Sequence, residues 1–164
     1  MDVIKEYLPN VYELGLFGDT GWLTALGSTL YMTIVPFLIG GAVGLIFGLL
    51  LVLMGPGGVI ENKPVAWVID KVTSTFRAIP FVILIAVLAP LTYLILQDNL
   101  GATAALVPLS FATFPFFARQ VQVVFSELDR GVIEAVQASG ATFWDIVKVY
   151  LGEGLPDLIR VSTV

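Results

Sequence analysis

Three long stretches of the chain contain no ionisable Asp, Glu, Lys or Arg: residues 20–60, 78–97 and 99–118. About 20 apolar residues in a helix cross the roughly 30 Å hydrocarbon core of a bilayer. Each stretch is therefore long enough to cross a membrane. A helix also satisfies all of its own backbone hydrogen bonds, which lipid cannot do for it. The sequence predicts an all-α, polytopic helical membrane protein.

The composition supports this class and argues against several kinds of chemistry. Of the 164 residues, 57% are hydrophobic and 13% are charged, against about 25% charged residues in an average soluble domain. The chain has neither Cys nor His, which removes disulfides, thiolate chemistry and imidazole catalysis. We expect no catalytic residue, no metal site, no bound cofactor and no nucleic-acid partner, so an enzyme is the least favoured interpretation.

The first uncharged block is too long for one simple span. Two short spans would need a polar turn near its middle, where only Gly40 and Gly41 are available. We interpret the block as one helix and keep two spans as the alternative. The predicted segments are an extracytoplasmic N-terminal segment over 1–21, spans over 22–54, 78–97 and 99–125, and a cytoplasmic loop over 55–77.

The positions of Lys and Arg predict the orientation. With three spans, seven of the eight basic residues lie either between the first and second spans or beyond residue 118, where the uncharged part of the third span ends, opposite Lys5. The positive-inside rule places both basic stretches in the cytoplasm and the N-terminus outside. With two spans in the first block, all eight would lie inside. The segment after the third span is cytoplasmic in both cases.

Three glycines mark a contact surface on the first predicted span. Gly40, Gly44 and Gly48 stand four residues apart and form one smooth strip. This small-xxx-small spacing lets helix backbones approach closely in lipid. We expect the strip to pack against another span of the same chain, and a seam between two copies is the alternative.

After the third span, the pattern predicts two short helices joined by a turn, over residues 127–152, which we call the hinge. Gly140 suits the left-handed position that ends a helix. Thr142 and Asp145 have the spacing of a capping box, in which the acid reaches back to the cap amide. Neither helix is long enough to be stable alone in water. The residues alone fit a connector lying on lipid headgroups and a docking site for a soluble protein equally well.

The sequence EAVQASG, from Glu134 to Gly140, is similar to the E-A-A-x-x-x-G loop of ABC importer permeases. The resemblance covers the chain from about Thr20 onward and is closest to the methionine-type uptake branch. It implies an ABC type I importer permease-like bundle with cytoplasmic coupling helices, which sit in a groove of an ATPase subunit. The segments that carry it are FRAIPF at 76–81, VPL at 107–109, PFFAR at 115–119 and GVIEAVQASGAT at 131–142.

The resemblance implies an ATPase-coupling surface and a set of partners. The surface comprises Glu134, Ala135, Ala138, Gly140, Ala141 and Thr142, with Ile146 and Val147 behind it. The implied partners are two copies of an ABC ATPase subunit, a second permease copy forming a homodimer, an extracytoplasmic substrate-binding protein and membrane lipid. ATP is expected to bind the ATPase partner, because this chain has no G-x-x-x-x-G-K-[ST] phosphate loop. No substrate-binding residue is predicted.

Two positions depart from the family pattern. Val136 replaces the third residue of the E-A-A motif, and the expected Leu-Pro comes three residues late, at Leu155 and Pro156. We therefore expect the second coupling helix to end differently from that of the family. Residues 155–164 are interpreted as the start of a further span, and family members continue for about two more transmembrane helices. We expect the chain to be truncated or a natural short form.

The predicted function is a permease subunit of an ATP-driven importer in the bacterial inner membrane, carrying a small amino acid, with methionine the first candidate. The alternatives are an ion-coupled secondary transporter and a non-transporting membrane scaffold subunit. Proton-coupled carriers usually place an acid or a His within the membrane, and the uncharged blocks hold neither. Sodium coupling stays open, because broken helices can bind Na⁺ through free carbonyl groups.

Overall fold

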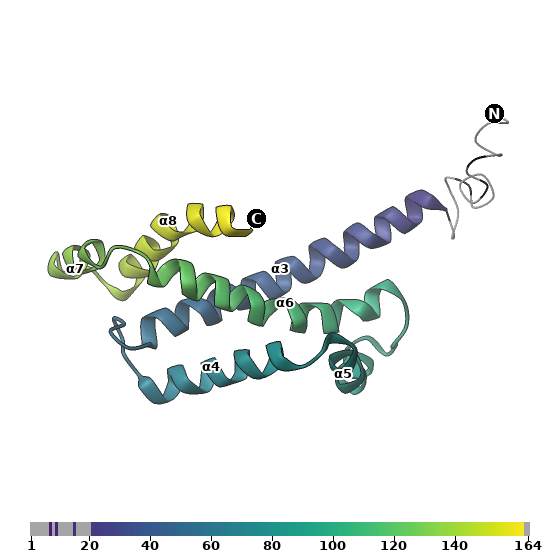
Figure 1. The fold of residues 1–164 in the computed structure, drawn as a ribbon, viewed down its shortest axis with the longest axis horizontal. Coiled ribbons are helices and arrows are strands. Elements are labelled where there is room, and N and C mark those ends of the chain that lie inside the picture. The colour runs from purple at the N-terminus through teal and green to yellow at the C-terminus, as the bar shows by residue number, and fades with distance from the viewer. Residues whose placement is uncertain (1–6, 8, 10–14, 16–20, 163–164) are drawn as a thin grey trace.

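Figure 1 shows the computed structural model of the chain, which describes Tyr7, Pro9, Gly15 and residues 21–162. Almost all of the predicted N-terminal segment, 1–21, thus lies outside the described residues. Within 21–162, every regular element is an α-helix. Two helices are each long and apolar enough to cross a membrane, and a bent pair of helices is a third candidate.

The first of these helices is α3 (Trp22–Met54), with 33 residues and a length of about 50 Å at 1.5 Å per residue. It has the bounds expected for the first span. Pro36 lies inside the helix without dividing it. The chain stays helical through Gly40 and Gly41, where the alternative of two short spans required a turn.

The segment expected to be a loop over 55–77 contains a helix, α4 (Lys63–Ala78). The side chain of Asn62 caps it by accepting from the Val65 N–H at 3.3 Å. Its buried residues, Ala66 and Thr73, lie two turns apart on one face. Sequence reasoning took the charged residues of this segment as a sign of a loop, whereas Lys63, Lys71 and Arg77 lie exposed on a helix and Asp70 pairs with Arg119.

The predicted second span, 78–97, corresponds to α5 (Phe81–Leu96). Its 16 residues reach about 24 Å, which is shorter than the hydrocarbon core of a bilayer. The axes of α4 and α5 meet at 111° across Pro80, so the pair forms a broken span or a re-entrant loop. Figure 1 views α5 nearly end-on, while α4 runs alongside the longer helices.

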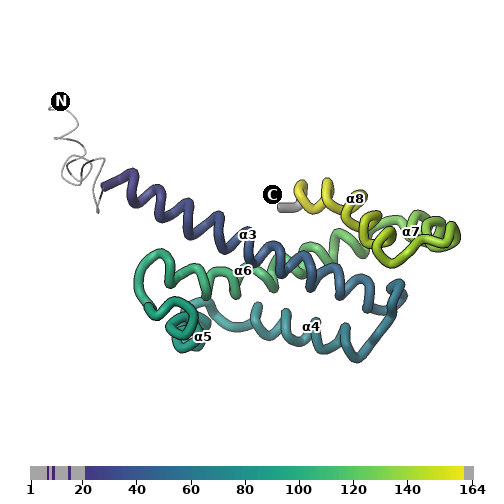
Figure 2. Tube along the Cα trace, turned by 180° about the vertical axis from the view of Figure 1, so that it is seen from behind, coloured from purple at the N-terminus to yellow at the C-terminus, as the bar shows by residue number. Residues whose placement is uncertain are grey.

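The most extensive helix contact joins α3 to α6 (Gly101–Ser126), which cross in both views (Figures 1 and 2). We call this contact the glycine seam, because Gly40, Gly44 and Gly48 lie buried along it. A Cβ on Gly44 would lie 2.7 Å from the carbonyl oxygen of Phe114. One on Gly48 would lie 2.5 Å from the carbonyl oxygen of Ala118. The backbones approach more closely than any side chain allows, and the expected packing within one chain is confirmed.

Two further helices, α7 (Arg130–Ala138) and α8 (Phe143–Ser162), lie at the end of the bundle where α3 and α6 finish (Figure 2). Sequence reasoning ended the second hinge helix near 152 and began a further span at 155. The structure instead has one helix of 20 residues running through Pro156. Gly154 and Leu158 are buried on either side of this proline, and Gly154 packs against the Phe125 ring. This packing outweighs the single backbone hydrogen bond that a proline removes.

Candidate functional site

The turn between α7 and α8 is closed by two backbone hydrogen bonds that form a Schellman motif. The N–H of Gly140 donates to the carbonyl of Gln137 at 3.0 Å, and the N–H of Ala141 donates to that of Val136 at 3.4 Å. Gly140 has a φ of +80°, a left-handed conformation that costs a residue with a side chain about 1–2 kcal/mol. The predicted left-handed glycine is confirmed.

The first turn of α8 carries the predicted capping box. The backbone N–H of Thr142 donates to Asp145 Oδ2 at 3.1 Å, and the Thr142 hydroxyl donates to the same oxygen at 2.6 Å. Lys148 Nζ lies 3.2 Å from Asp145 Oδ1. The hydrogen bonds from Thr142, and then Lys148, lower the pKa of Asp145 below its usual range. The direction of α8 is therefore fixed directly after the turn.

The inner side of the hinge is buried against the ends of the long helices. Ile133 of α7 and Ile146, Val147 and Tyr150 of α8 are each at most 8% exposed. Burial raises the pKa of the Tyr150 hydroxyl, which belongs to α8 and lies outside the candidate membrane spans. These side chains pack in one cluster with Leu53 of α3 and with Val121, Val124 and Phe125 of α6. We call this group the hinge cluster; it joins the hinge to both sides of the glycine seam.

The outer side of the hinge exposes small residues together with the rings of Phe143 and Trp144. The exposed members of the predicted coupling surface are Glu134, Ala135, Ala138, Gly140 and Thr142. Ala141 is half-buried at their edge, and Ile146 and Val147 lie buried beneath. The structure thus brings all eight predicted residues together around one turn, with the two expected behind the surface in the hinge cluster. Their role in coupling stays a prediction.

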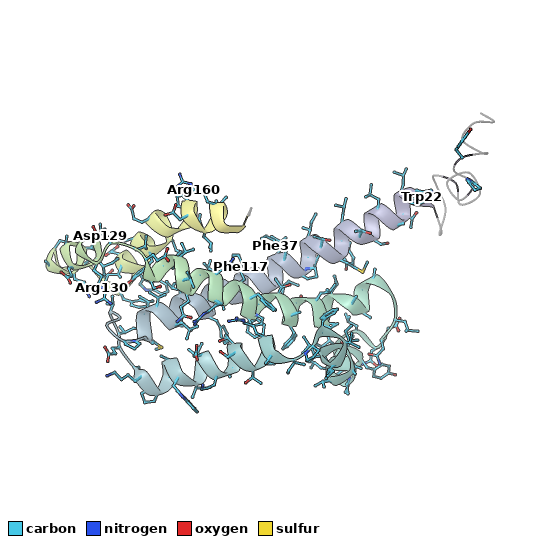
Figure 3. The ribbon with its side chains drawn as sticks, in the orientation of Figure 1. Trp22, Phe37, Phe117, Asp129, Arg130 and Arg160 are labelled. Atoms are coloured by element: carbon cyan, nitrogen blue, oxygen red, sulfur yellow. The ribbon has the colours of Figure 1, made fainter. Side chains whose placement is uncertain are left out.

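A polar cavity of about 360 Å³ separates α7 from the connection between α3 and α4. Arg130, Glu134 and Gln137 line it on α7, and residues 55–59 line it on the connection. The Arg130 guanidinium, at the hinge end in Figure 3, lies 3.4 Å from the position that a Cβ on Gly57 would take. Sequence reasoning missed this contact, although the run Gly55-Pro56-Gly57-Gly58 marked a place of close backbone approach.

Comparison with known proteins matches most of the chain to one family. A family model described as "Binding-protein-dependent transport system inner membrane component" matches residues 44–161. The D-methionine transport system permease protein MetI of Escherichia coli (strain K12) is 40% identical over 146 residues, and that of Yersinia pestis is equally similar. A relative from Pasteurella multocida is 42% identical over 137 residues.

Solved structures give the same result for the fold. Two crystal forms titled as inward facing conformations of the MetNI methionine ABC transporter align with TM-scores of 0.82 and 0.84. They are 39% and 36% identical in sequence and cover 87% and 95% of this chain. The predicted all-α, type I ABC importer permease-like fold is confirmed.

The chain is shorter than the proteins that it matches. The alignment covers 83% of this chain but 63% of the Pasteurella relative, and 87% of this chain but 67% of the E. coli one. Of the MetNI permease chains it covers 67% and 69%. The family match nevertheless extends from the C-terminal third of α3 through the hinge and into the last turns of α8. The chain therefore belongs to the family of binding-protein-dependent transport system inner membrane components.

Proposed function

We propose that the chain is a membrane-spanning permease subunit of an ATP-driven ABC importer for methionine. The observation that carries this proposal is the two-sided hinge. Its outer face offers small side chains around a rigid turn, and its inner face is buried in the hinge cluster with α3 and α6. The MetI relatives are D-methionine transport permeases by name, which supports methionine as the cargo.

The hinge has the mechanical properties that a coupling element needs. Its turn is fixed by the Schellman bonds at Gly140 and by the capping box at Thr142. Its inner side chains contact both long helices, including the Phe125 ring, whose centroid is 6.0 Å from that of Tyr150. A push on the outer face is therefore transmitted to α3 and α6 as a rigid displacement, because close-packed interiors transmit strain.

The outer face favours a protein partner over the lipid surface. α7 exposes the small side chains of Ala135 and Ala138 beside the carboxylate of Glu134. The exposed rings of Phe143 and Trp144 at the start of α8 suit a protein partner as well as a lipid surface, so the small residues and the charge of α7 decide the assignment. Small side chains let another protein approach the helix backbone closely. We assign this face to the groove of an ABC ATPase subunit, which binds the ATP, and place the hinge in the cytoplasm and the N-terminus outside.

The complete importer then contains two copies of this permease, two ATPase subunits and an extracytoplasmic binding protein. The name of the matched family supports the binding protein, and the MetNI structures support the ATPase partner and the permease pair. ATP-driven closure of the ATPase pair moves the hinges, and the hinges rock the membrane helices between inward- and outward-facing states.

Transport by the reconstituted complex tests this function. Proteoliposomes holding the permease, its ATPase and its binding protein are expected to accumulate labelled L- or D-methionine only with ATP inside, and vanadate should abolish uptake. Uptake driven by a sodium gradient without ATP would identify a secondary carrier. If the complex assembles but uptake is the same with and without the permease, the chain is a scaffold subunit.

Crosslinking tests the docking face separately. The chain has no cysteine, so a single Ala138→Cys places one thiol on the outer face of the hinge. We expect it to crosslink to a cysteine in the ATPase groove. Ile159→Cys is the control, since Ile159 is 58% exposed on α8 but lies outside the hinge. Equal crosslinking at both positions, or none at Ala138, would contradict the assigned face.

A further inference from the structure

Two adjoining cavities run along one side of α6 and share Phe81 and Leu109 in their walls. Their lining residues on α6 recur every three or four positions, which is one face of a helix. That face extends from Gly101 to Gln120, about 29 Å at 1.5 Å per residue. This is about the thickness of the hydrocarbon core of a bilayer. The cavities thus form one lengthwise groove, which we call the α6 groove.

The two ends of the α6 groove differ in the size of their side chains. Near Gly101 the α6 wall is made of small residues such as Ala104 and Ala105, which also suit close contact with another helix. Near Gln120 the groove widens to about 550 Å³, within the range of about 300–1,000 Å³ that is usual for small-ligand pockets. The wider end is the candidate binding site.

Four phenylalanines from three helices line this wide end: Phe37 of α3, Phe81 of α5, and Phe116 and Phe117 of α6. The rings of Phe37 and Phe117 meet edge to face, 6.1 Å apart, where α3 and α6 cross (Figure 3). Phe37 and Phe116 are 51% and 58% exposed. The aromatic surface is therefore preformed and accessible, a combination that favours a ligand with an apolar part.

Two polar groups accompany the aromatic rings. Gln120 lines the wide end directly. The guanidinium of Arg77, at the end of α4, lies 5.7 Å from the ring centroid of Phe116. In the described part of the chain no ion pair joins Arg77 to a carboxylate, whereas Arg119 pairs with Asp70 at 3.6 Å. Arg77 thus lies beside the groove against one of its rings, and its charge has no carboxylate partner among the described residues.

We propose that the wide end of the α6 groove holds a neutral amino acid in transit, with its apolar side chain among the phenylalanines and its carboxylate on Arg77. This inference rests on the proposed importer function. A thioether is favoured at aromatic ring edges, and a guanidinium binds a carboxylate through charge-assisted hydrogen bonds. A lipid or a neighbouring helix would also cover the rings, and a lipid phosphate would also pair with the cation, but neither would distinguish methionine from norleucine.

Binding of labelled methionine to the purified permease–ATPase complex, without binding protein, tests the site directly. We expect saturable binding that weakens at least about tenfold in Phe116→Ala and in Arg77→Gln. Arg77→Lys should recover part of the loss, since it keeps the charge. Tyr93→Ala is the matched control, because Tyr93 is 53% exposed on α5 and lies outside the groove. It should bind like the unaltered complex.

Selectivity distinguishes a binding site from a packing surface. Phe116→Leu keeps an apolar side chain but removes the ring, so preference for methionine over norleucine should fall about two- to tenfold, the range of a sulfur–aromatic contact. If the groove only seats lipid or another helix, the groove variants will lower the yield of assembled complex and leave this preference unchanged. That result overturns the proposal.

Different results would refute the importer function and the binding site in the groove. If the unaltered complex shows no ATP-driven methionine uptake, the proposed function is wrong. If uptake is normal but methionine does not bind without the binding protein, or binds equally well to Phe116→Ala and Arg77→Gln, the importer function stands and the groove site is wrong.

Discussion

The glycine seam and the hinge turn both depend on glycine, for opposite reasons. Along the seam, Gly44 is helical, and a Cβ there would meet the α6 backbone within 3.0 Å. At the hinge, Gly140 has open space around the Cβ position but a φ of +80°. The seam therefore needs the absence of a side chain, and the hinge needs the backbone freedom of glycine. The first requirement concerns how two spans pack, and the second concerns where the hinge points.

The largest expected effect follows from adding a side chain to the seam. In Gly44→Val, the new atoms collide with the carbonyl oxygen of Phe114, so α3 and α6 must separate along their whole contact. Overpacking of this kind destabilises by about 1–3 kcal/mol, and a rigid backbone neighbour places this variant at about 3 kcal/mol. The yield of monodisperse protein in detergent and its thermal unfolding should both fall.

Gly27 is the control for this variant, since it lies in the same helix with no atom within 4 Å of a Cβ. Gly27→Ala should leave stability unchanged or raise it by up to about 1 kcal/mol, because alanine is the better helix former. A Gly44→Ala variant as stable as Gly27→Ala would show that the seam is loose enough to accept a methyl group.

A medium effect, confined to transport, is expected at the hinge turn. Gly140→Val forces a β-branched residue into the left-handed region, at a cost of about 1–3 kcal/mol, but adds no clash. The hinge cluster keeps the protein folded, so membrane insertion should persist. ATP-driven uptake should fall about tenfold, the equivalent of about 1.4 kcal/mol.

Two further variants separate backbone conformation from side-chain contact at Gly140. Asn tolerates the left-handed region, so Gly140→Asn should recover most of the uptake. Gly152, on α8, also has open space but no positive φ, and Gly152→Val should leave uptake nearly unchanged. If uptake and ATPase docking survive Gly140→Val, the coupling role of the hinge is refuted.

The sequence predicts those features that depend on residues close together along the chain. Local rules identified the left-handed Gly140, the Thr142–Asp145 box and the glycine strip, because each depends on neighbours within a few residues. Uncharged length identified α3 and α6 for a similar reason. The geometric content of these predictions is confirmed, whereas the coupling role remains to be tested.

Features that depend on tertiary packing were missed. The continuity of α8 through Pro156 depends on contacts such as Gly154 with Phe125. The bend of 111° between α4 and α5 lies at Pro80, and its size does not follow from the proline alone. The wide end of the α6 groove joins Phe37 to residues far along the chain, and no local pattern predicts that meeting. The spacing of Phe116 and Gln120 on one face of α6 was the one signal available in the sequence.

The smallest expected effect comes from the capping box and depends on pH. The pKa of Asp145 is lowered in the folded protein, chiefly by the Thr142 hydrogen bonds, so its stabilising contribution is complete above the ordinary carboxyl pKa of about 3.9. That contribution is lost as pH falls through the lower folded value.

The thermal stability gap between the unaltered protein and Asp145→Asn should be small and constant from about pH 5 to 8. It should narrow as pH falls below about 3.9 and close only below the lowered folded pKa, whereas the Gly44→Val deficit, which involves no titrating group, should not close. If the stability difference between the unaltered protein and Asp145→Asn does not change with pH, the charge of Asp145 does not contribute to the cap. The hinge would then depend, like the glycine seam, on the fit of its side chains and not on a charged hydrogen bond.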